Sequence, residues 1–204
     1  MKRFFLVIFI IFTASLSGAF AQTASDIPEK VSLLTFENFT IESNSKFINE
    51  EIFVKKIKQA VLLLKKNCPD DFKNMQSVIG KIRATQVSGA NYNEEIMTID
   101  IARGTFDSTL AWVTSVLAHE THHIKKYKDS GKKYGGAAQM TDKKAALQVM
   151  IDEELECNRV QLEVLKKVGG TKFEIDYLEA QKGDHFDIDK DGDYDWDDYY
   201  QRTW

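Results

Sequence analysis

Three of the four histidines of this chain lie within five residues of one another, in the sequence His119-Glu120-Thr121-His122-His123. On a helix, residues four apart project from the same face, so the imidazoles of His119 and His123 can hold one metal ion. Glu120 follows the first of these histidines, where its carboxylate can accept a proton from a metal-bound water. This spacing predicts a zinc site on a helix, with Glu120 as the general base.

A catalytic zinc ion usually has three protein ligands and one water molecule, so a third ligand must come from another segment. The acidic segment 152–159, which reads Asp-Glu-Glu-Leu-Glu-Cys-Asn-Arg, offers Glu153, Glu154 and Glu156. All three glutamates fall within about one helical turn, and their spacing alone leaves the choice between them open.

The two segments together resemble the motifs of the gluzincin metallopeptidases, over about residues 95–168. In that family a second helix carries a glutamate ligand four residues before an Asp or Asn, and Glu154 and Asn158 fit this pattern. The resemblance implies that Glu154 completes the zinc site and that Asn158 hydrogen-bonds a ligand histidine. It also implies that 96–102 is an edge strand that pairs with the substrate backbone. An ordinary core strand is the alternative for 96–102.

The resemblance predicts a secreted zinc-dependent metallopeptidase that acts on a peptide or protein substrate. The motif specifies hydrolysis more closely than it specifies the substrate. A zinc-dependent amidase of cell-wall peptides is therefore one alternative, and a non-catalytic metal-binding module is the other.

Aspartates recur at alternate positions near the C-terminus, at Asp187, Asp189, Asp191, Asp193 and Asp195, and Asp198 follows three residues later. The first three and Gly192 match positions 1, 3, 5 and 6 of an EF-hand Ca²⁺ loop, so the segment resembles an EF-hand or dockerin-like loop. Asp198 stands where that loop has glutamate, which shortens one ligand arm. We expect the tail 182–204 to bind Ca²⁺ and to attach the C-terminus to the domain; a solvated acidic tail is the alternative.

The first 21 residues have the composition of a secretory signal peptide. A basic head at 1–3 is followed by an apolar run at 4–12 and by small residues that end in Ala-Phe-Ala before Gln22. The apolar run is shorter than the about 20 residues that span a bilayer, so no stable membrane anchor is expected after cleavage. These features predict a secreted or periplasmic protein. The net charge of −4 argues against a nucleic-acid partner.

The chain has two cysteines, Cys68 and Cys157. An exported protein meets an oxidising environment, in which an even pair of cysteines predicts one disulfide bond. Two buried free thiols are the alternative, because the sequence does not show whether the two residues lie close together.

The metal-binding motifs need helices and a sheet to position them. Hydrophobic periodicity and the Pro and Gly positions predict these elements. Helices are expected over 47–66, 70–79, 107–128, 141–168 and 173–181, and strands over 31–39, 82–87 and 96–102. The sequence thus predicts an α+β fold: a mainly helical zincin-like domain at 22–181 with a small β-sheet beside the zinc helix, followed by the acidic tail.

Overall fold

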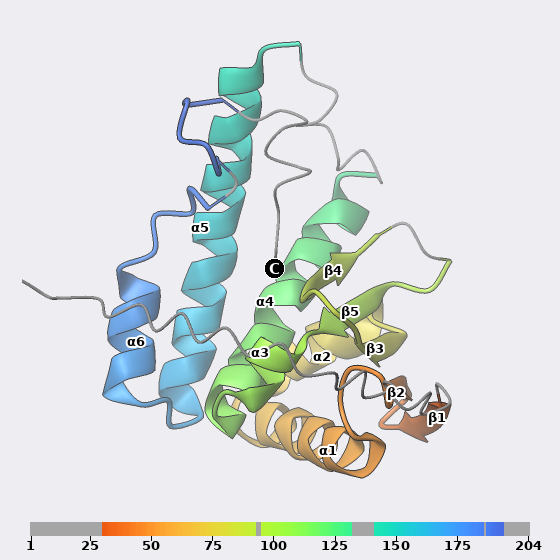
Figure 1. Ribbon diagram of the computed structural model, residues 1–204. Coiled ribbons are helices and arrows are strands. Elements are labelled where there is room, and N and C mark those ends of the chain that lie inside the picture. The colour runs from red at the N-terminus through yellow and green to blue at the C-terminus, as the bar shows by residue number, and fades with distance from the viewer. Residues whose placement is uncertain (1–29, 93–94, 132–140, 186, 194–204) are drawn as a thin grey trace, which may run out of the picture.

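A computed structural model describes residues 30–92, 95–131, 141–185 and 187–193 (Figure 1). The described chain is mixed α+β, with long helices and one small sheet, as predicted. The leader expected at 1–21 and the calcium ligands expected at Asp195 and Asp198 lie outside these ranges. Within them, no helix has both the length and the hydrophobicity to cross a bilayer.

The sheet has five strands in the order β1-β2-β3-β5-β4. Their bounds are β1 (Val31–Phe36), β2 (Phe39–Asn44), β3 (Lys81–Ala84), β4 (Gly89–Asn91) and β5 (Thr98–Ile101). The segment predicted as one edge strand at 31–39 contains β1, which is indeed at an edge, and a two-residue turn into β2. Glu37 and Asn38 both have positive φ angles, 49° and 71°, as a tight hairpin turn requires.

The free edge of the sheet beside the histidine helix is β4 instead of the predicted strand at 96–102. β5, which forms within 96–102, lies between β3 and β4, parallel to the first and antiparallel to the second. Both sides of its backbone are therefore paired, and it cannot receive a substrate strand. β4 forms in the stretch between the predicted strands 82–87 and 96–102, where the sequence predicts no strand.

The five predicted helices are all present, and a sixth, short helix precedes the histidine motif. Their bounds are α1 (Glu50–Asn67), α2 (Pro69–Val78), α3 (Arg103–Asp107), α4 (Leu110–Asp129), α5 (Lys143–Lys167) and α6 (Lys172–Glu179). The Thr109 side chain accepts a hydrogen bond from the Trp112 N–H and begins α4, and Asp142 does the same for Ala145 at the start of α5. These caps satisfy backbone donors that have no partner inside the helix.

Helix α4 lies between two layers of the molecule, with the sheet, α1 and α2 on one side and α5 on the other (Figure 1). Its apolar side chains, among them Val113, Leu117 and Ile124, are fully buried. Each such side chain contributes about 1.5–3 kcal/mol of burial free energy, which fixes the helix firmly in the core. The histidine motif is thereby placed on a rigid, central element that faces α5.

Candidate metal site

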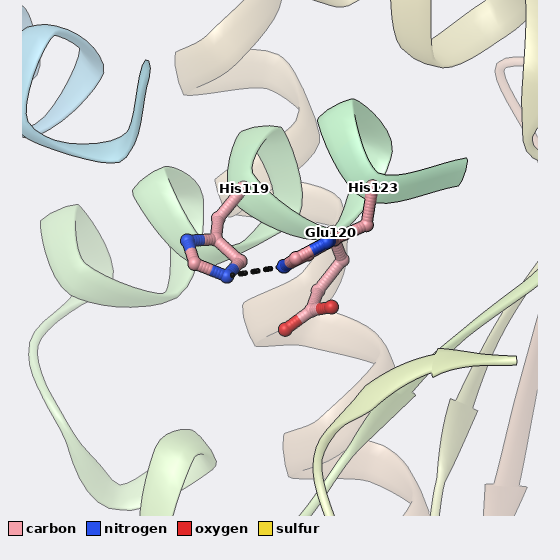
Figure 2. A group of neighbouring side chains, drawn as sticks. All are labelled: His119, Glu120 and His123. Atoms are coloured by element: carbon pink, nitrogen blue, oxygen red, sulfur yellow. Dashed lines mark hydrogen bonds between the residues drawn. The ribbon is translucent and has the colours of Figure 1, made fainter. Parts of the chain in front are cut away.

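His119 and His123 lie one turn apart on α4, and their imidazole rings turn toward each other (Figure 2). The two Nε2 atoms are 3.0 Å apart. Glu154 reaches the same point from α5, with one carboxylate oxygen 3.5 Å from His119 Nε2 and the other 3.3 Å from His123 Nε2. Two nitrogen donors and a carboxylate therefore converge from two helices.

The separations between these donor atoms can be compared with those expected around a metal ion such as zinc. A zinc ion lies about 2.0–2.1 Å from nitrogen and oxygen ligands, so two donors of a tetrahedral site are about 3.3–3.4 Å apart. The observed 3.0, 3.3 and 3.5 Å lie on either side of this value. The two Glu154 distances involve its two different oxygens, and His119, His123 and Glu154 lie close enough together to share one metal ion.

The structure separates the roles of the three glutamates on α5. Glu153 lies 2.9 Å from Nδ1 of His123, on the side of the ring opposite the donor cluster. Glu156 instead contacts His122, at 3.0 Å, and Lys126. Of the three glutamates, only Glu154 is close to both Nε2 atoms. Glu153 can orient His123 by accepting a hydrogen bond from Nδ1, which leaves Nε2 to face a metal.

The supporting role predicted for Asn158 is taken by Glu153. Within the described part of the chain, no hydrogen bond joins Asn158 to either imidazole. Nδ1 of His119 is buried without a hydrogen-bond partner. The second nitrogens of the two rings are therefore supported unequally: Nδ1 of His123 has Glu153 as its partner, whereas Nδ1 of His119 has no hydrogen-bond partner.

Burial and the carboxylates set the protonation of this cluster when no metal is bound. Burial lowers the pKa of His119 to about 3, so this ring is neutral and has a lone pair for a metal. Burial also acts to lower the pKa of His123, but hydrogen bonds with Cys157, Glu153 and Glu154 outweigh it and hold that pKa well above its usual range. A metal ion must therefore displace a proton from His123.

Glu120 lies beside the ligands and beside the free edge of the sheet. His119, Glu120 and Glu154 are only 7%, 8% and 8% exposed. This burial raises the pKa of Glu120 to about 7, although the charge of His123 and a hydrogen bond from the Ala90 backbone N–H oppose the shift. A carboxylate with a pKa near neutrality suits general base catalysis.

We expect Glu120→Gln to stabilise the metal-free protein at pH 8 and to do so less at pH 5. The folded protein keeps the Glu120 proton up to about pH 7, whereas the unfolded chain loses it near 4.5, so stability falls as the pH rises through this window. At pH 8 the buried charge costs about 3 kcal/mol. Melting curves in chelator at the two pH values measure the difference, with exposed Glu51→Gln as control. An equal gain at both pH values would contradict the expectation.

The predicted disulfide between Cys68 and Cys157 is not formed, and both are buried free cysteines. Cys68 lies at the start of α2, where its charged neighbours are Asp71 and Lys167. Lys167 is ten residues, or about 15 Å, along α5 from Cys157. A disulfide needs Cα atoms less than about 7 Å apart, and this separation along α5 is consistent with two free thiols. Cys157 instead lies beside His123 and Glu153.

Tyr92, which follows β4, is a site residue that the sequence does not reveal. Its ring stacks on Tyr127 of α4, with centroids 4.8 Å apart. Burial raises the pKa of its hydroxyl, and His123 and Glu120 are among the charges that act on it. Tyr92 therefore lies close to the donor cluster and remains neutral. Tyr127 supports Tyr92 through this ring contact.

The first three predicted calcium ligands, Asp187, Asp189 and Asp191, each have a carboxylate oxygen within 4.8 Å of the other two. Asp193 is half-buried close by in the chain. These aspartates are separate from the histidine cluster in sequence, because they belong to the tail that follows α6. The described residues thus contain three groups of candidate metal ligands: His119, Glu120 and His123; His123, Glu153 and Cys157; and the three aspartates, whose donors are all oxygen.

Comparison of the chain with protein-family models, with curated proteins and with solved structures finds no match in any of the three. The structure itself shows that His119, Glu120 and His123 form a buried group whose ligand atoms lie close enough together to hold a metal ion. The choice of metal and of reaction therefore depends on the donor types and their geometry.

Proposed function

We propose that this protein is a secreted zinc-dependent metallopeptidase that hydrolyses peptide bonds. The observation that supports it most strongly is the convergence of His119, His123 and Glu154 at the donor separations of tetrahedral zinc. Three protein ligands leave a fourth position for water, as in catalytic zinc sites and unlike closed structural ones. The leader-like sequence at 1–21 supports export.

In this proposal Glu120 moves the proton. A bound zinc ion polarises the substrate carbonyl and lowers the pKa of water. A carboxylate oxygen of Glu120 accepts a proton from the attacking water and delivers it to the departing amide nitrogen. Its burial keeps competing solvent away from the transfer. The neutral Tyr92 hydroxyl nearby can donate a hydrogen bond to substrate oxygen.

The proposed position for the substrate is along β4. Ala90 in this strand donates its backbone N–H to Glu120, so the unpaired side of the strand faces the proposed general base. An extended peptide that adds to this edge places a backbone carbonyl beside the donor cluster. This arrangement favours a peptide over a compact small molecule as the substrate.

Metal analysis and proteolysis test the proposal together. We expect the purified chain 22–204 to contain about one zinc ion and to cleave members of a mixed peptide library, with cleavage lost in chelator and restored by zinc. His119→Ala/His123→Ala should reduce the zinc content to background. Unchanged zinc in this double variant would mean that the site lies elsewhere.

The same measurements separate the two alternatives from the proposal. A zinc-containing protein that leaves the library intact but cleaves amides in cell-wall peptides is an amidase. A protein that binds zinc and cleaves neither is a non-catalytic module. The library is analysed by mass spectrometry, so that a narrow cleavage preference is still detected.

A further inference from the structure

Two aspartates of residues 187–193, Asp187 and Asp193, each have a buried carboxylate oxygen with no hydrogen-bond partner. Asp187 is only 8% exposed, and its Oδ1 atom is buried without a hydrogen bond; the same holds for Oδ1 of Asp193. A buried carboxylate oxygen that has neither a hydrogen-bond donor nor a cation beside it lowers the stability of the folded protein. Two such atoms in one short loop indicate that the loop is shaped around a cation.

Backbone hydrogen bonds hold the loop closed around this point. Oδ2 of Asp187 accepts from the N–H of Gly192 at 3.2 Å, and Oδ1 of Asp189 accepts from the N–H of Asp191 at 3.2 Å. Oδ1 of Asp191 accepts in turn from the N–H of Asp193 at 3.0 Å. Each of these three aspartates is therefore fixed against the backbone, and their carboxylates remain close together despite their like charge.

The lysine within the loop does not neutralise the cluster. Nζ of Lys190 donates to the Asp184 carbonyl oxygen at 3.0 Å and lies 3.9 Å from the Asp184 carboxylate. Its charge is thus directed to a residue outside the group of Asp187, Asp189 and Asp191. Lys190 therefore does not supply a partner for the buried Oδ1 atom of Asp187.

We propose that residues 187–193 form a calcium site, with Asp187, Asp189, Asp191 and Asp193 as its ligands in this range. All of the donors are oxygen, which suits a hard cation such as Ca²⁺ better than zinc. The alternate spacing with glycine after the third aspartate is that of a Ca²⁺-binding loop. Because the donors and the position differ from those of the histidine site, the two sites take different ions.

The calcium site fastens the C-terminal segment onto α5. A β-carbon at Gly183 would lie 2.9 Å from the Ile151 carbonyl oxygen and 3.5 Å from Cβ of Glu154, so only glycine fits there. The φ angle of Gly183, +71°, also favours glycine. Figure 1 shows the segment, in dark blue, beside α5. Gly183 thus lies against the helical turn that carries Glu154, and the first proposed calcium ligand, Asp187, follows it four residues later.

The test uses the chain 22–204 with Ca²⁺ alone as the probe. We expect 10 mM Ca²⁺ to raise the melting temperature by roughly 3 to 10 °C, because an ion with a Kd of about 10⁻⁴ to 10⁻³ M that binds only the folded loop stabilises it. His119→Ala/His123→Ala should show the same rise, which makes the result independent of the zinc proposal. Asp187→Asn should lose the rise and weaken calorimetric Ca²⁺ binding at least tenfold, whereas Asp184→Asn should keep both.

Three results would overturn the calcium site. The first is a wild-type melting temperature that Ca²⁺ does not change, or that 10 mM Mg²⁺ raises by the same amount. Either result is what an ordinary acidic surface would give. The second is a Ca²⁺ response that disappears in the double histidine variant, because the ion would then bind at the histidines. The third is equal Ca²⁺ affinity in Asp187→Asn and wild type, which shows that the buried carboxylate is not a ligand even if the variant is destabilised.

Discussion

Glu120→Gln is expected to lower the rate of peptide hydrolysis by about 10²- to 10⁴-fold and to leave the zinc content at about one ion per chain. The amide of glutamine is close to the carboxylate in shape and can still accept the hydrogen bond from the Ala90 N–H, so the site should keep its geometry. It cannot accept a proton from water at neutral pH. Cleavage should therefore be lost without loss of metal.

The measurement compares the initial cleavage rate of a peptide, chosen from the library, with zinc content in the same preparation. Glu51→Gln, on the exposed face of α1, controls for the loss of one carboxylate. A variant that retains zinc and at least a tenth of the wild-type rate would show that Glu120 is not the general base. A variant that loses zinc as well would place Glu120 among the groups that hold the metal.

The helices could be predicted from the sequence because their signals are local. Apolar spacing marked the faces of α1, α4 and α5, and the capping residues Thr109 and Asp142 begin α4 and α5 where predicted. The glycine pair that begins at Gly169 ends α5, and Gly169 has a φ angle of +84°. Each of these features depends on residues within a few positions of each other.

The arrangement of the sheet could not be predicted in the same way. β4 consists of Gly-Ala-Asn, a composition typical of turns, and it becomes a strand only because Gly89, Ala90 and Asn91 pair with β5. This pairing is a tertiary effect that no local pattern shows. The consequence for function is large, since it moves the free sheet edge from 96–102 to 89–91.

The disulfide failed as a prediction for a related reason. The number of cysteines and the expected compartment describe whether a bond is chemically allowed, but bond formation depends on distance. Cys68 lies among the residues at the far end of α5 from the donor cluster, and Cys157 lies within that cluster. The packing of α2 against the rest of the chain decides this separation.

The choice of the third ligand shows how far the sequence could define the site. Helical periodicity placed Glu153, Glu154 and Glu156 on neighbouring faces of one turn, and the gluzincin resemblance favoured Glu154. The rotation of α5 against α4 decides between them, and it is fixed by contacts along the whole helix pair, such as the one from Gln161 to Ser115. Geometry then places Glu154 at the Nε2 atoms.

Glu154→Gln is therefore expected to weaken zinc binding by roughly 100-fold or more, beyond the losses typical of residues that only support a ligand. Its carboxylate is held ionised: burial acts to raise the pKa of Glu154, but a hydrogen bond from His123 and the charges of the nearby histidines together lower that pKa to about 2. Glutamine removes that charge and leaves a weaker oxygen donor. No other carboxylate in the described chain lies within hydrogen-bonding distance of both Nε2 atoms to replace it.

The matched substitutions on the same helix predict a graded series. Glu153→Gln should weaken zinc binding by about 10-fold, because it loosens the orientation of His123. Glu156→Gln should leave the zinc affinity unchanged, because Glu156 contacts His122 and Lys126 away from the donors. Competition with a fluorescent chelator at pH 7.5 measures all three. Equal losses would indicate a general destabilisation of α5, and a larger loss for Glu153→Gln than for Glu154→Gln would transfer the ligand role to Glu153.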